Sequence, residues 1–150
     1  RHVIKQADYV LAYQNEGNYD EALKLYEKYS GKKDEFDNKV LEGLNSIVIQ
    51  IKDRFANEEI DYSTAKEQLD ILNDYNISKL DNEIYETSKW IDKINTSRDN
   101  YKEGMKYYEQ GDLSAALEKY KLVISEDVKY YNLAKNEIDR IELRQWIYRN

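Results

Sequence analysis

The sequence has no cysteine, no proline and only five glycines among its 150 residues. Without cysteine the chain forms no disulfide and offers no thiol nucleophile. The lack of proline and the few glycines leave little material for the many turns of a β-sandwich or a β-barrel. Residues that favour helices, such as Leu, Lys, Glu, Gln and Ala, are plentiful. We therefore expect an all-α protein.

Histidine is almost absent as well, because the only one is His2 at the start of the chain. A catalytic histidine or a histidine-based metal site therefore cannot be assembled. Carboxylates are frequent, as in "NEEID" (57–61) and "KLDNEIYE" (79–86), but their pattern is that of solvated helix faces. The sequence also lacks the spacing of a calcium loop and a glycine-rich phosphate loop. These absences predict a protein that is not an enzyme and that has no metal and no cofactor.

The charge of the chain limits its partners. Thirty acidic residues against 23 basic ones give a net charge of -7, which argues against nucleic acid or an anionic membrane as a partner. Arg140, Arg144 and Arg149 alternate with Asp139 and Glu142, so we interpret them as a solvated end of a helix. The longest apolar runs, such as residues 47–49, are far shorter than the ~20 residues that span a bilayer. No membrane insertion by these residues is expected.

Two features bear on the origin of the chain. It begins with Arg1, which indicates an excised or processed piece of a larger protein. The bias toward Lys, Asn, Ile and Tyr is typical of an AT-rich bacterial genome, and a chain without cysteine resembles an ectodomain of the cell envelope. We therefore favour an extracytoplasmic location, although a cytoplasmic origin also fits the composition.

Helical periodicity predicts about seven helices in a single domain that covers residues 1–150. The expected units are antiparallel hairpins over residues 1–30, 34–75 and 78–125, followed by a last helix over 127–148. Within the third hairpin the first helix is unusually long. The polar stretch "NTSRDN" (95–100) is the point at which we expect it to bend or end.

A repeated pattern links two of these hairpins. "GNYDEALKLYEKY" (17–29) aligns with "GDLSAALEKYKLV" (111–123), so that Ala22 lies over Ala116 and Tyr26 over Tyr120. A small residue at the alanine position lets two helix backbones approach, and the large residues beyond it fill the seam. Four of the 15 tyrosines are expected in this seam: Tyr13, Tyr26, Tyr107 and Tyr120. A weaker third copy aligns Ala65 with Ala22 if the preceding turn contains a single extra residue.

This pattern resembles the tetratricopeptide repeat. The residues that match best are Gly104, Tyr107, Gly111, Asp112, Ala116, Tyr120 and Val123, and the first copy matches through Tyr13, Gly17, Asn18, Ala22, Tyr26 and Tyr29. The copies lie 94 residues apart (111 minus 17), whereas the family period is about 34, and the repeat-closing proline is absent. The resemblance implies hairpins stacked as an array with divergent spacing. It also implies a concave surface for a protein or peptide, lined by Leu11, Gln14, Tyr101, Met105 and Tyr108.

Three functional hypotheses follow. The first is a non-catalytic protein-interaction or scaffold module within a larger protein, and it is the one we favour. The second is a domain that binds a small ligand or a cell-wall polymer in a pocket lined by tyrosines and by Trp90 or Trp146. The third is a structural stalk, which predicts no groove and no sizeable exposed apolar patch. Tyr101 and Met105 also have a simpler interpretation, which is packing against their own chain.

Overall fold

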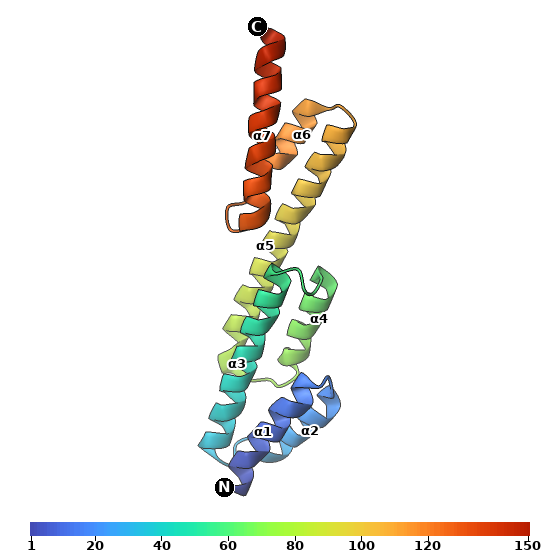
Figure 1. The fold of residues 1–150 in the computed structure, drawn as a ribbon. Coiled ribbons are helices and arrows are strands. Elements are labelled where there is room, and N and C mark those ends of the chain that lie inside the picture. The colour runs from blue at the N-terminus through green and yellow to red at the C-terminus, as the bar shows by residue number, and fades with distance from the viewer. The chain divides into compact units, whose positions relative to one another are not determined.

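The computed structural model describes residues 1–150 and confirms the all-α prediction, with seven helices and no strand. The helices are α1 (His2–Asn15), α2 (Tyr19–Tyr29), α3 (Asp34–Ala56), α4 (Tyr62–Asn73), α5 (Ser78–Glu109), α6 (Leu113–Tyr120) and α7 (Val128–Arg149), as Figure 1 shows. The helix α5 continues through "NTSRDN" and does not end there. Contacts divide the chain into two compact units, Arg1–Ile91 and Asp92–Asn150, and α5 contributes residues to both. The single-domain organisation stays a prediction.

The N-terminal unit consists of α1 to α4 and the first part of α5. Its helix α1 lies against both α2 and α3, and α3 lies against α4. The helices pack together because each of them has apolar residues three or four positions apart, which lie on one face. The buried side chains of this unit include Val10, Phe36, Val40, Leu44, Val48, Ile51, Leu69, Leu72, Leu80 and Ile84.

The C-terminal unit consists of the rest of α5, α6 and α7. Its core is small and rich in tyrosine. The buried members are Ala116, Tyr120, Val123, Ala134 and Ile141, and half-buried rings from α5 and α7 pack around them, including Tyr101, Tyr107, Tyr108, Tyr130 and Tyr131.

The turns at Gly17 and Gly111 have the same geometry. Both glycines have positive φ, 83° and 80°, a region that L-residues adopt at a cost. The N–H of Gly17 donates to the carbonyl of Gln14 at 3.1 Å and that of Asn18 to Tyr13 at 2.9 Å. After Gly111 the equivalent distances are 3.0 and 2.9 Å. These paired bonds form a Schellman ending, so the repeat in the sequence is also a repeat of backbone geometry.

The shared register extends beyond the hairpin. The third helix of each unit begins at residue 34 or 128, and these positions also differ by 94. Phe36 then corresponds to Tyr130, and Val40 corresponds to Ala134. Val40 and Ala134 are both buried. The two units therefore share a plan of three helices without any insertion or deletion from Gly17 to Val40.

The turn between α3 and α4 corrects the alignment of the third copy. Here Glu58 takes the glycine position with a φ of 62°, and the N–H of Glu59 donates to the carbonyl of Arg54 at 2.8 Å. Asp61 caps α4 by accepting a bond from the Thr64 N–H at 2.8 Å. Two residues therefore lie between the positive-φ residue and the cap, where the glycine turns have none. The prediction of a single extra residue was wrong, because the loop adds both Glu59 and Ile60.

Replacing either Gly17 or Gly111 by Ala is expected to lower the free energy of unfolding by about 1 kcal/mol. A Cβ at either position would meet no atom within 4 Å, so only the positive φ opposes the change and the two effects should be equal. The measurement is urea unfolding followed by circular dichroism. Glu16→Ala is the matched control, because Glu16 has an ordinary φ of -79°. A loss as large in the control would show that backbone conformation is not the cause.

Candidate functional site

Leu11 and Gln14, the two predicted partner-binding residues of the N-terminal unit, both face helices of their own chain. A Cβ at Gly43 of α3 would overlap the methyl groups of Leu11, so Leu11 fills the space that this glycine leaves. Gln14 is only 7% exposed, and its Oε1 accepts a hydrogen bond of 2.6 Å from the hydroxyl of Tyr75. Their role in binding a partner stays a prediction, and the structure assigns both of them packing contacts.

The three predicted residues of the C-terminal unit lie on α5. The ring of Tyr101 packs against Tyr120 and Tyr130, with centroids 5.6 and 5.1 Å away. The hydroxyl of Tyr108 accepts a hydrogen bond of 3.2 Å from Arg144 of α7. Met105 is 42% exposed, so it is the member of this set with the most surface free for a partner. Tyr101 and Tyr108 are thus both in contact with residues of α7.

The four tyrosines predicted for the seam differ in burial. Tyr120 is fully buried, whereas Tyr13, Tyr26 and Tyr107 are half-buried. Burial raises the pKa of Tyr120 to about 12, and the negative charge of Glu137 adds to the effect. This hydroxyl therefore stays protonated at neutral pH and acts as part of a core.

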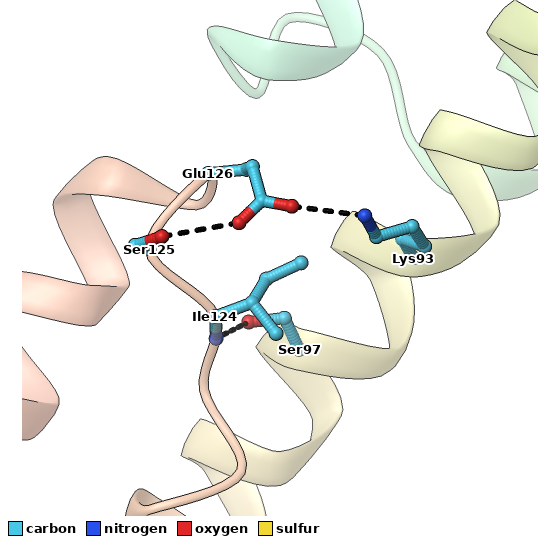
Figure 2. Close-up of polar contacts among 5 residues, drawn as sticks. All are labelled: Lys93, Ser97, Ile124, Ser125 and Glu126. Carbon is cyan, nitrogen blue, oxygen red and sulfur yellow. Dashed lines mark hydrogen bonds and ion pairs between the residues drawn. The ribbon is translucent and has the colours of Figure 1, made fainter.

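Sequence reasoning missed a set of contacts that holds the loop between α6 and α7 against α5. Figure 2 shows Ser97 on α5 accepting a hydrogen bond of 3.0 Å from the N–H of Ile124, and Lys93 contacting Glu126 at 2.9 Å. The bond from Lys93 lowers the pKa of Glu126. This contact therefore stabilises the fold at neutral pH and is lost as the pH falls through the lowered pKa of Glu126. The only sequence signal was "NTSRDN", whose polar residues interrupt an apolar pattern.

At the end of the same loop lies an ion pair that is largely buried. Arg98 of α5 and Asp127, which precedes α7, approach to 3.6 Å between Nε and Oδ1, and their side chains are 13% and 3% exposed. Asp127 is thus a charged residue in the core of the C-terminal unit. This pair adds to the contacts through which Lys93 and Ser97 hold the loop against α5.

A small polar cavity of about 80 Å³ lies in the N-terminal unit where the α1–α2 turn meets α3 and α4. Its lining contains four amide side chains, one arginine and one tyrosine beside two isoleucines: Gln14, Asn15, Tyr19, Ile47, Gln50, Ile51, Arg54 and Gln68. No carboxylate is among them. The buried Gln14, one of the predicted site residues, thus lies at the wall of this cavity.

The second half of α7 is apolar on its exposed side. Leu143, Trp146 and Ile147 are 57%, 62% and 56% exposed, and their spacing of three and four residues puts them on one face. The last turns of α7 extend beyond the turn between α5 and α6 (Figure 1). Trp90, the other tryptophan, lies under the ammonium group of Lys52, which is 4.7 Å from its ring centroid.

Two further observations concern cofactors and membranes. No three His, Cys, Asp or Glu side chains are grouped so that they could hold a metal ion. None of the seven helices combines the length and the apolar character needed to cross a bilayer.

Comparison of the chain with models of protein families, with curated proteins and with solved structures finds no match.

Proposed function

We propose that the protein is a non-catalytic interaction module whose helical hairpins stack in a tetratricopeptide-like manner. The observation that carries this proposal is the exposed apolar face of Leu143, Trp146 and Ile147 at the end of α7. The chain as a whole is strongly polar, with a mean hydropathy of -0.94. Contiguous exposed apolar side chains on such a protein are typical of interaction sites. The same patch argues against a purely structural stalk.

A comparison of α7 with α3 supports a role for this face beyond the fold of the unit. In the common register the buried Val48, Ile51 and Phe55 of α3 correspond to Glu142, Gln145 and Arg149 of α7. Of these three polar residues, Glu142 and Arg149 are exposed and Gln145 is half-buried. The side that α3 buries is therefore polar in the second half of α7. Conversely, Leu143, Trp146 and Ile147 take the places of Ile49, Lys52 and Asp53.

The equivalent side of α3 indicates what kind of element fits. There Lys52 contacts Trp90 of α5, a helix that lies alongside α3. Three arginines (140, 144 and 149) and one glutamate, Glu142, accompany the apolar residues of α7 between 140 and 150. We propose that the partner is an amphipathic helix of another protein, with carboxylates beside its apolar stripe. The apolar residues would supply affinity, and the opposite charges would favour correct orientation.

The test is a photo-crosslinking amino acid at position 146, with the same group at the exposed Lys135 as the control. In the cells that produce the protein, we expect position 146 to crosslink to an acidic amphipathic helix of one partner. The double variant Leu143→Ser, Ile147→Ser, with the crosslinker retained at 146, should lower the yield about tenfold or more. Equal yields at 146 and 135 would contradict the proposal. Crosslinks to a second copy of this chain would replace it by self-association.

A further inference from the structure

The polar cavity of the N-terminal unit has the features of a binding site for a small anion. Four segments meet at it, because the end of α1, the start of α2, the second half of α3 and α4 each contribute side chains. On α3, Gln50 and Arg54 are four residues apart, so they project on one face of the helix. The cavity is thus formed by the stacking of the first hairpin on the second.

Gln14 gives the cavity a donor of fixed orientation. Its Oε1 is occupied by the hydroxyl of Tyr75 at 2.6 Å. Tyr75 is itself buried, and this burial raises the pKa of its hydroxyl, which therefore remains a donor. An amide whose oxygen is engaged leaves its NH₂ group free to donate. Gln14 is more than nine-tenths buried and lies in the wall of the cavity.

The lining of the cavity differs in charge from the rest of the N-terminal unit. Residues 1–91 contain 12 basic and 19 acidic side chains, which gives this unit the whole net charge of -7. No carboxylate residue lines the cavity, whereas the exposed Arg54 does. A buried amide donor and a guanidinium are groups that bind a carboxylate with charge-assisted hydrogen bonds.

The size of the cavity limits the ligand. A volume of about 80 Å³ is far below the roughly 300–1,000 Å³ of sites for drug-sized molecules. It is large enough for a few waters or for one small polar group. We infer that this cavity binds a carboxylate group, held by the NH₂ of Gln14 and the guanidinium of Arg54. This inference is independent of the interaction proposed for α7.

Side-chain amide NMR of the ¹⁵N-labelled protein tests this inference with acetate as the probe. A site with a dissociation constant of about 1 mM is nearly saturated at about 50 mM ligand. We expect the Gln14 NH₂ resonance to shift with saturation on acetate addition. Acetamide and an equal ionic strength of sodium chloride should not produce this shift. A shift that does not saturate, or that acetamide reproduces, would mean that the cavity holds only water and would overturn the inference.

Two variants locate the site. Arg54→Gln and Gln14→Met should each weaken acetate binding by about tenfold or more, because each removes a hydrogen bond to the charged group. In Gln14→Met the binding is read from the side-chain amides of Gln50 and Gln68, which also line the cavity. Arg140→Gln is the matched control, since it removes the same charge from an arginine that is 70% exposed in the other unit. Unchanged affinity in Arg54→Gln would contradict the assignment even if acetate binds.

A second probe distinguishes a free acid from the side chain of a partner. N-acetylglutamate N-methylamide carries the same carboxylate on a peptide backbone. Saturable binding of acetate alone would identify a small free acid as the ligand class. Tighter binding of the glutamate derivative would identify an acidic side chain of another protein. Either result supports a carboxylate as the ligand of the cavity. If neither compound binds, the inference is overturned.

Discussion

Replacing Arg98 by Met is expected to lower the free energy of unfolding of the C-terminal unit by about 3–5 kcal/mol. The change leaves the carboxylate of Asp127, whose side chain is only 3% exposed, without the cation that lies 3.6 Å away. It also removes the guanidinium from the ring of Tyr130, where it lies 5.7 Å from the centroid. A buried charge that loses an opposite charge recovers less of the free energy that it cost to take it out of water. Since small domains are stable by only about 5–15 kcal/mol, this loss is a large fraction of the stability of the unit.

The double variant Arg98→Met, Asp127→Leu separates charge burial from loss of packing. Removing both charges should recover most of the lost stability, because no uncompensated charge remains. Hydrogen exchange read by mass spectrometry can follow α6 and α7 separately from α1 to α4. Arg140→Met is the surface control, since this arginine is 70% exposed and pairs with Glu137 at 3.0 Å, and it should change stability by less than about 1 kcal/mol. If the double variant is as unstable as Arg98→Met, the buried pair does not hold the loop.

The contrast between Arg98 and Gly111 explains what could be predicted from the sequence. A glycine between two amphipathic segments is a local signal for a turn with positive φ, and both Gly17 and Gly111 have this conformation. Glu58 also has a positive φ, but it is not a glycine, so the sequence gives no sign of this conformation. The length of that turn was therefore misjudged. The polar residues Ser97 and Arg98 contact a loop almost 30 residues further along the chain. No local pattern reveals such a partner.

The same limit applies to the candidate sites. Gln14 was selected because the repeat places it on one side of α1, but its partner Tyr75 is 61 residues away. The cavity beside it also needs the stacking of three other segments. At the other end of the chain, the spacing of Leu143 and Ile147 indicates one apolar helix face. Whether another element covers that face depends on where α5 and α6 end, which periodicity cannot supply.

The second large effect concerns Phe36, at the contact between the first hairpin and α3. Phe36→Ala is expected to lower the free energy of unfolding of the N-terminal unit by about 3–5 kcal/mol. Phe36 is completely buried and packs against Tyr26 and Tyr29, with ring centroids 6.1 and 6.0 Å away. Its removal would leave a cavity between the first hairpin and α3. Urea unfolding followed by tryptophan fluorescence, together with hydrogen exchange of α1 to α4, measures the loss.

Ile49→Ala is the control for this change, because Ile49 lies on the same helix but is 59% exposed. It should alter stability by no more than about 0.5 kcal/mol. Tyr130→Ala tests the repeat itself, since Tyr130 takes the equivalent position in the C-terminal unit and packs against Tyr101. Its ring is only half-buried, so its loss should destabilise that unit by less than Phe36→Ala destabilises the other. A similar loss in Ile49→Ala would show that helix content, and not the seam between hairpins, sets the stability of the N-terminal unit.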